Sequence, residues 1–235
     1  MSPCQVRVLG STIRAAVCAA LVLALCALRL NSAGAISAMP EPTVCLSGTC
    51  FTAHQTAAAL KLPLRGVSTY RYYGMKLFTA ALYAPMDASG AQGVLSDVPK
   101  RLVLRYHRKI GRQHLIKAAE HNLRGLPEQR LAAIRERLDR LNACYQDVDK
   151  GDEYALVYAP ERGTTLERNG SPVITVPGQD FAREYFGIWL SARSISSDLT
   201  HDLLGVSSGK RLLADTELSA QRSSAPNRGY VSSGD

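Results

Sequence analysis

The amino-acid sequence predicts an α+β fold, in which an antiparallel β-sheet carries its helices on one face. Apolar runs of strand length, rich in aromatic and β-branched residues, occur before and after a pair of segments with helical periodicity. An Asn169-Gly170 dipeptide between two such runs predicts a two-residue hairpin turn, which joins antiparallel strands. Two further helical segments follow this hairpin. Strands, helices, strands and helices in this order are typical of α+β domains.

The stretch from Leu64 to Pro85 is the centre of the predicted sheet. It reads LRGVSTYRYYGMKLFTAALYAP. We expect a turn at Gly66, then a basic and tyrosine-rich patch, and then a strand from Leu77 to Tyr83 that ends before Pro85. Cations at the mouth of a buried aromatic strand suit an acidic or phenolic small molecule.

The remaining elements follow from periodicity and turn signals. Gly, Ser and Asp predict a loop over residues 86–93. Residues 100–110 alternate in polarity, with Leu102, Leu104 and Tyr106 expected on one face of a strand. The other expected elements are a helix after Gly111, a helix whose first turn holds Pro127, a strand over 153–160, a hairpin over 164–176, a helix over 179–190 and a short helix over 197–204.

Residues 1–35 have the pattern of a secretory signal peptide. Arg7 and Arg14 precede a 14-residue apolar run from Ala15 to Leu28, and an A-x-A site follows at residues 33–35. The run is shorter than the roughly 20 residues that span a bilayer, although an uncleaved membrane anchor remains the alternative. We therefore expect an exported protein in the periplasm. Residues 36–44 are expected to be a linker, 45–205 the folded domain, and 206–235 a disordered tail, because the tail is polar and lacks periodicity.

Cleavage of the signal would leave three cysteines. Cys45 and Cys50 enclose a short loop, and we predict that they can form a disulfide in an oxidising compartment. Cys144 is expected to be a small buried residue at a helix end. No set of residues has zinc-ligand spacing, so we predict no metal and no cofactor.

The charge of the chain argues against a nucleic-acid partner. The formal net charge is +8, and it falls to +5 once Arg7, Arg14 and Arg29 of the signal segment are subtracted. The other cations are scattered among acids, whereas a nucleic-acid binder needs a basic stripe or a recognisable motif. Membrane contact is expected only through the signal segment before its cleavage. The oligomeric state is left open.

Four blocks of the sequence occur together in one known family. These are the stretch 64–85 quoted above, VPKRLVLRYHRKI (98–110), LNACYQDVDKGDEYALVYAPERGTTLERNG (141–170) and VPGQDFAREYFGIWLSARSIS (176–196). In this order they resemble the bacterial chalcone isomerase-like domain, from about Cys45 to Gly205. The resemblance implies an antiparallel sheet with helices on one face and a ligand cleft between the two layers.

The resemblance also implies a set of catalytic residues, most of which this sequence lacks. Flavonoid-active members use a turn arginine, a strand threonine, a helix tyrosine and asparagine, and a hydroxyl on the last conserved helix. The strand position falls on Phe78 and the last-helix position on about Ile188, neither of which has a hydroxyl. Thr79 is one residue further and therefore points to the opposite face. Catalytic residues are thus unknown, and chalcone cyclisation is disfavoured.

The resemblance also implies a second function, because some members of this family bind a fatty acid. In these members an arginine and a strand tyrosine hold the carboxylate. Arg71 or Arg65 would supply the cation here, while the tyrosine position again falls on Phe78. Tyr83 and Tyr106 complete the predicted ligand-binding set. The alternatives are core packing for Phe78 and Tyr83 and a surface cation for Arg71.

We therefore predict that the chain binds a small amphipathic acid resembling a fatty acid, between sheet and helices. One alternative is an isomerase that acts on a chalcone-like or other unknown substrate, and another is an interaction protein of the cell envelope. An open apolar pocket with Arg71 at its mouth would favour ligand binding. A core sealed by side chains would favour the envelope-interaction alternative.

Overall fold

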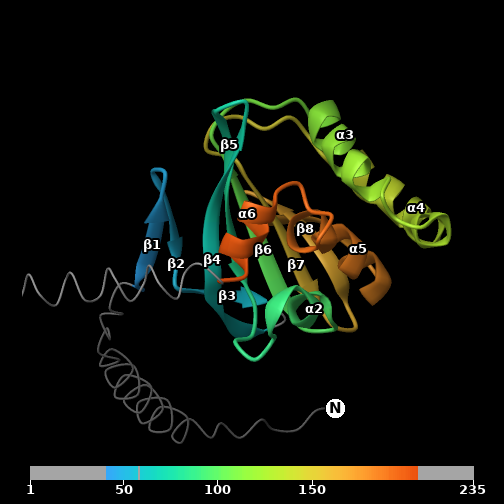
Figure 1. Ribbon diagram of the computed structural model, residues 1–235, viewed down its shortest axis with the longest axis horizontal. Helices are drawn as coiled ribbons and strands as arrows, with labels where there is room; N and C mark the ends of the chain where they lie inside the picture. The colour runs from blue at the N-terminus through green and yellow to red at the C-terminus, as the bar shows by residue number, and fades with distance from the viewer. Residues whose placement is uncertain (1–40, 58, 206–235) are drawn as a thin grey trace, which may run out of the picture. The chain divides into compact units, whose positions relative to one another are not determined.

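The computed structural model describes residues 41–57 and 59–205 (Figure 1). The predicted signal peptide, the first part of the predicted linker and the predicted tail lie outside the described residues. Strand β1 begins at Thr43, so the last two residues of the predicted linker belong to a strand. Within the described ranges, no helix is both long and apolar enough to cross a membrane.

One antiparallel sheet of seven strands forms the centre of the domain. Its strands are neighbours in the order in which they occur along the chain, and every pairing is antiparallel (Figure 1). The strands are β3 (His54–Ala57), β4 (Leu60–Tyr72), β5 (Met75–Tyr83), β6 (Lys100–Tyr106), β7 (Glu153–Ala159), β8 (Gly163–Arg168) and β9 (Ser171–Val176). The β8–β9 turn has Asn169 and Gly170 at φ values of 49° and 80°, as the two-residue hairpin predicted from the sequence requires.

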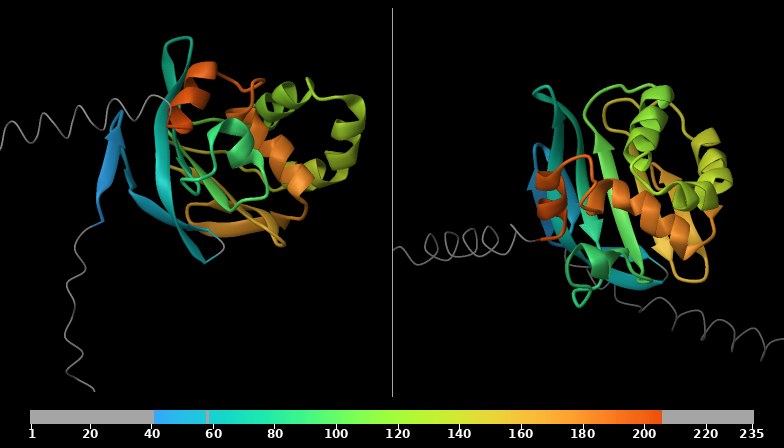
Figure 2. Two further views of the ribbon diagram at one scale, coloured as in Figure 1. Left: turned by 60° about the horizontal axis from the view of Figure 1, so that its bottom comes forward. Right: turned by 45° about the vertical axis from the view of Figure 1, so that its right-hand side comes forward.

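The helices lie on one side of the sheet, which confirms the predicted α+β class. They are α2 (Gly90–Leu95), α3 (Arg112–Leu123), α4 (Glu128–Ala143), α5 (Gln179–Leu190) and α6 (Ser197–Leu203). Figure 2 shows α5 and α6 against the sheet and the α3–α4 pair further out, beside α5. The main core lies between sheet and helices. Helix α5 is the most deeply buried, with nine buried residues.

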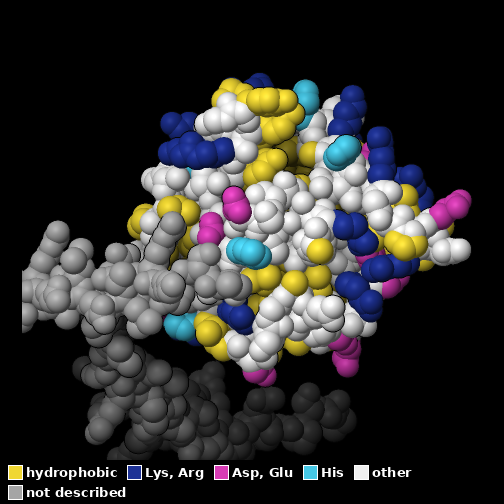
Figure 3. Space-filling view, viewed as in Figure 1, with side chains coloured by type: hydrophobic (Ala, Val, Ile, Leu, Met, Phe, Trp, Pro, Cys, Tyr) yellow, Lys and Arg dark blue, Asp and Glu magenta, His cyan; other side chains and the backbone are white. Residues whose placement is uncertain are grey.

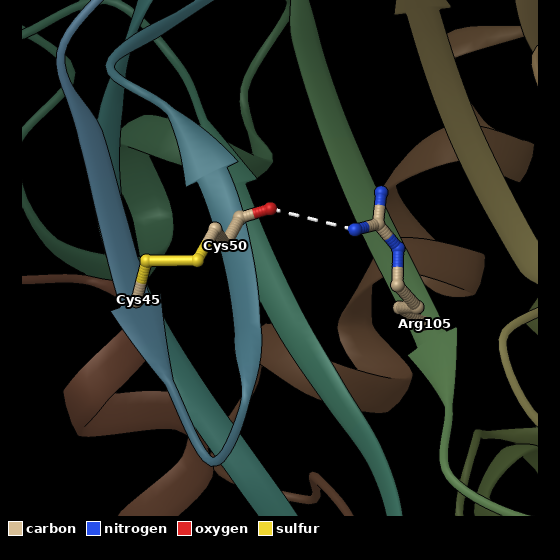
Figure 4. The surroundings of a disulfide bond; sticks show 3 residues. All are labelled: Cys45, Cys50 and Arg105. Atoms are coloured by element: carbon tan, nitrogen blue, oxygen red, sulfur yellow. Dashed lines mark hydrogen bonds between the residues drawn. A yellow bond between two sulfur atoms is a disulfide. The ribbon is translucent and has the colours of Figure 1, made fainter.

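A smaller second core covers the opposite face of the sheet. It is formed by Phe51 of the hairpin β1 (Thr43–Leu46) and β2 (Thr49–Thr52), together with residues of β3 to β7. Cys45 and Cys50 face each other across this hairpin and form a disulfide (Figure 4). Arg105 of β6 donates to the Cys50 carbonyl oxygen at 3.4 Å and lies over the Phe51 ring. The disulfide hairpin is thereby attached to the sheet.

Two local predictions were wrong. Gly66 lies within β4 at a β-bulge and not in a turn, because the carbonyl of Asp202 in α6 approaches this point too closely for any side chain. Residues 86–93 are not entirely a loop, because α2 begins at Gly90. Glycine disfavours a helix, but Val94 is fully buried and its packing outweighs that preference.

Candidate functional site

Aromatic side chains fill the space between sheet and helices. The Phe78 ring stacks on Tyr70 at 5.3 Å between centroids and meets the Tyr106 ring at 6.0 Å. Further in, the hydroxyls of Tyr145 and Tyr185 are 2.8 Å apart and hydrogen-bonded. All of these rings except Tyr70 are buried. The layer that holds the ligand cleft in the expected architecture is therefore packed with side chains in this protein. A filled layer favours the envelope-interaction alternative, and ligand binding requires another site in the domain.

The buried tyrosines of this layer are neutral at ordinary pH. Burial raises the pKa of Tyr106, Tyr145 and Tyr185 well above the ordinary phenol value. Their hydroxyls can therefore donate or accept hydrogen bonds, but none of them is a phenolate that could act as a base. This chemistry suits the recognition of a polar group better than proton abstraction.

The structure brings together only two of the five ligand-binding residues predicted from the sequence. Phe78 and Tyr106 lie side by side on the helical side of the sheet. Tyr83 lies on the opposite face in the second core, where its hydroxyl donates to the Thr52 carbonyl oxygen at 3.0 Å. Since β5 alternates its side chains, residues 78 and 83 cannot share a face.

Neither predicted arginine lies in the aromatic layer. Arg65 donates to the carbonyl oxygens of Pro85 and Ala88, at 2.6 and 3.1 Å, and so holds the segment that follows β5. Arg71 is exposed at the end of β4, and its nearest hydrogen-bond partner is the Gly74 carbonyl oxygen at 3.4 Å. Arg71 thus lies at the exposed end of the β4–β5 hairpin.

The hydroxyl-bearing residue next to Phe78 has a structural partner. Thr79 Oγ1 lies 2.7 Å from His107 Nε2 and 3.0 Å from Thr69 Oγ1, on the face of the sheet that carries the β1–β2 hairpin. Thr79 is fully buried, so no substrate can reach its oxygen. At the other predicted hydroxyl position, Ile188 of α5 is 4% exposed and packs in the main core.

A hollow with amphipathic walls lies between α3 and α4. Its volume is about 90 Å³, and Leu123, Leu131 and Leu138 form the apolar part of its wall. Arg124 and Arg135 provide two guanidinium groups, and Glu120 provides one carboxylate. Both arginines are exposed, so the cationic groups lie at the rim and the leucines below them.

A second, much smaller hollow lies on the other side of Leu123. It has a volume of about 10 Å³ and reaches Gly187 and Ile188 of α5. Leu123 therefore lines both hollows, one within the α3–α4 hairpin and one that reaches α5.

Ion pairs fasten α4 to α5. Arg130 donates to the buried carboxylate of Glu184, with an Nε–Oε1 distance of 3.0 Å. Arg137 donates to Asp180 at 2.8 Å, and this contact lowers the pKa of the Asp180 carboxyl. Helices α3 and α4 bury few of their own residues, two and four respectively. The hairpin is thus held by these ion pairs together with the apolar residues that it contributes to the main core.

The residues of the α3–α4 hollow were not among those predicted from the sequence. The two helices that carry them were predicted, one after Gly111 and one with Pro127 in its first turn. Which arginines stand beside the leucines of the hollow depends on the angle between these two helices, which periodicity does not determine. A pair of cations next to an apolar helix face is the only signal that the sequence contained.

The observed geometry defines a small α+β domain with a filled interior and an amphipathic hollow on its helical side. The chain belongs to the chalcone isomerase-like family, whose model matches residues 44–205. Among solved structures, it is similar to a fatty-acid binding protein of Arabidopsis thaliana, with a TM-score of 0.55 and 13% sequence identity. The match covers 70% of this chain and 96% of the plant protein, and it shows a shared fold. No curated protein matches the sequence.

Proposed function

We propose that this protein binds a small amphipathic acid, with the acid group at Arg124 and Arg135 and the apolar part on the leucines of the α3–α4 hollow. The observation that carries the proposal is the composition of this hollow, in which two exposed guanidinium groups border a wall of three leucines. Guanidinium groups form charge-assisted, often bidentate hydrogen bonds with carboxylates. The family resemblance and the fatty-acid binding neighbour support the same ligand class.

The size of the hollow determines how a long-chain ligand must enter. Pockets for small molecules usually measure about 300–1,000 Å³. A hollow of about 90 Å³ accepts only the first part of an alkyl chain. The remainder requires the α3–α4 hairpin to move outward and Leu123 to turn aside. This movement would break the contacts of Arg130 with Glu184 and of Arg137 with Asp180, which join α4 to α5.

Binding is favoured over isomerisation by the residues at the two predicted hydroxyl positions. Phe78 and Ile188 are both buried in the core and offer no hydrogen bond to a reacting ketone. Burial also keeps the nearby tyrosines protonated, since it raises their pKa. The positions that carry the catalytic hydroxyls in flavonoid-active members therefore supply no group that could activate a ligand.

The proposal can be tested by native mass spectrometry of the protein purified from its own cells, before and after addition of a C16 fatty acid. We expect a one-to-one complex whose dissociation constant rises about tenfold or more in R124A/R135A. Arg71→Ala provides the comparison, because Arg71 was the anchor predicted from the sequence. Loss of binding in R71A alone would place the acid group at the hairpin tip. A protein that binds no acid in any form would refute the proposal.

Volume offers a second, independent test. Leu131 is half-buried in the wall of the hollow, and the larger ring of Leu131→Phe would narrow the space. We expect this variant to remain folded and to lose the fatty acid. Val173→Phe, a similar enlargement at an exposed position of β9, should leave binding unchanged. Equal binding by both variants would exclude this hollow as the site.

We also propose that the protein is exported to the periplasm. The signal-peptide pattern of residues 1–35 supports export, and so does the Cys45–Cys50 disulfide, since disulfides persist in oxidising compartments. Intact-mass measurement of the protein from a periplasmic extract should give a chain that begins near residue 36. A full-length chain in the cytoplasmic fraction would contradict this assignment.

A further inference from the structure

The β4–β5 hairpin ends in an exposed apolar tip. Its side chains are Tyr72, Tyr73 and Met75, with exposed fractions of 52%, 87% and 46%. The two tyrosine rings meet edge to face, with 4.5 Å between their centroids. Figure 3 shows hydrophobic side chains at the top of the molecule, over the end of this hairpin, with Lys and Arg side chains on both sides. We call Tyr72, Tyr73 and Met75 the tip.

The turn geometry does not account for an aromatic residue at position 73. Tyr73 and Gly74 form a two-residue turn between paired Tyr72 and Met75, with φ values of 46° and 77°. Positive φ is unfavourable for a bulky side chain, and asparagine is the usual residue at this position. The β8–β9 turn of the same sheet indeed has Asn169 there, at φ 49°. Tyr73 therefore weakens the turn while exposing a large ring.

Cations surround the tip without acidic partners. Arg71 and Lys76 stand directly opposite each other on the hairpin, a like-charge pairing that destabilises a sheet. Arg108 Nη1 lies 2.7 Å from the Met75 sulfur. The ion pairs found in the described part of the chain involve none of these three cations. Positive charge is thus concentrated at this end of the molecule.

The pKa of the neighbouring His107 is consistent with this positive charge. Burial lowers the pKa of His107, and the nearby charges of Lys76, Lys150 and Arg71 lower it further. No carboxylate contributes to this shift. The tip is therefore an apolar, aromatic projection in a positive environment.

We propose that the tip docks on the surface of an anionic lipid bilayer, with its two tyrosines and Met75 at the headgroup boundary and Arg71, Lys76 and Arg108 facing lipid phosphates. Tyrosine suits this boundary because one end of its ring is apolar and the other is polar. Basic side chains are attracted to anionic leaflets. A stable protein interface buries at least about 1,200 Å², whereas three side chains on a narrow hairpin offer far less.

This docking surface differs from the sequence-based expectation that the membrane is contacted only through the signal segment. It is also independent of the proposed ligand site, since the tip belongs to the β4–β5 hairpin and the hollow to α3 and α4. Either proposal can fail while the other holds. If both hold, a protein that binds an amphipathic acid would approach the membrane through its β4–β5 hairpin.

The test is a vesicle cosedimentation assay with the protein as its own cells process it. Vesicles of phosphatidylcholine alone are compared with vesicles that contain 30% phosphatidylglycerol, at low and high salt. We expect binding only to the anionic vesicles, weakened by salt. R71Q/K76Q should lower the partition coefficient about fivefold for each cation removed. Tyr73→Asn should lower it by about fivefold or more while improving the turn.

Two control variants test whether the loss of any exposed cation or any exposed apolar side chain has the same effect on vesicle binding. Arg162→Gln removes an exposed cation from the β7–β8 turn at the opposite end of the sheet, and Met86→Gln removes an apolar side chain that is 67% exposed. Both should bind vesicles like the unmodified protein. Binding by the N-terminal segment would be common to all variants and would cancel in the comparison. Wild-type binding by Y73N and R71Q/K76Q, or no vesicle binding at all, would overturn the proposal.

Discussion

Arg130 on α4 and Glu184 on α5 form an ion pair in which only the Glu184 side chain is buried. The Glu184 side chain is 7% exposed, whereas that of Arg130 is 45% exposed. Arg193 lies 3.9 Å from the second carboxylate oxygen and is the other cation near it. The carboxylate is thus removed from water and depends on two arginines from different parts of the chain. Because Arg130 belongs to the α3–α4 hairpin, the pair links the hairpin position to the core.

Arg130→Ala is expected to destabilise the protein by about 1–3 kcal/mol. Removing one partner of a buried pair usually costs about 3–5 kcal/mol, and Arg193 should recover part of this by approaching Glu184. Arg135→Ala on the same helix is the control, because its pair with Asp139 is exposed and should contribute less than about 0.5 kcal/mol. Urea unfolding measures the free energy of unfolding of both variants. Equal losses in the two variants would show that the buried carboxylate is satisfied without Arg130.

The burial of Lys100 leads us to expect an unusual dependence of the free energy of unfolding on pH. Its side chain is 1% exposed, its ammonium group donates to the Ser96 carbonyl oxygen at 2.8 Å, and it lies over the Tyr158 ring. Burial lowers its pKa to about 7, an effect that Asp97 only partly opposes. The unfolded chain keeps the lysine proton up to about pH 10, so between pH 7 and 10 the unfolded state binds more protons. The free energy of unfolding should therefore rise with pH in this window.

The change is measurable by urea unfolding at pH 7, 8 and 9. The contribution of Lys100 should increase stability by at most ~1.4 kcal/mol per pH unit. Lys100→Met should remove this rise and be more stable than the unmodified protein at pH 7. Lys117→Met, at an exposed position of α3, should leave the slope unchanged. A K100M protein with the same slope would show that Lys100 keeps its proton at neutral pH and above.

Much of the fold could be predicted from local patterns. The hairpin at Asn169-Gly170, the amphipathic helix α5 and the opposite faces of Phe78 and Thr79 all follow from spacing within one element. The family resemblance then supplied the order of layers. The elements that were missed are those whose structure depends on distant residues. Helix α2 forms because Val94 is buried, and the bulge at Gly66 exists because α6 approaches it.

The candidate site was less predictable than the fold. Arg71 was assigned to a ligand because the family resemblance implies an arginine at this point, but it lies exposed at the end of the β4–β5 hairpin. Tyr83 was expected near Phe78, yet an odd number of steps along a strand sends it to the second core. Arg124 and Arg135 become neighbours only when α3 and α4 fold together. Sequence patterns identify which residue types are present, whereas their convergence depends on angles between elements.

Gly66→Ala should be among the most damaging small substitutions in this protein. A Cβ atom at residue 66 would lie 1.9 Å from the carbonyl oxygen of Asp202, a backbone atom of α6. Because backbone cannot move aside as a flexible side chain can, α6 would have to leave β4 and break the 2.8 Å hydrogen bond from Ser68 to Asp202. We expect a loss of about 3 kcal/mol or more, at the upper end of overpacking effects.

Urea unfolding and hydrogen exchange of α6 would together locate this effect. In G66A, the amides of α6 should exchange much faster than those of α5, because the clash acts on the α6 backbone. Gly187→Ala is the matched control, since its Cβ would meet Ser191 atoms at an ordinary 3.7 Å and alanine favours the helix. That variant should gain up to about 1 kcal/mol. A G66A protein with normal stability and a protected α6 would mean that α6 does not pack against β4 at this distance in solution.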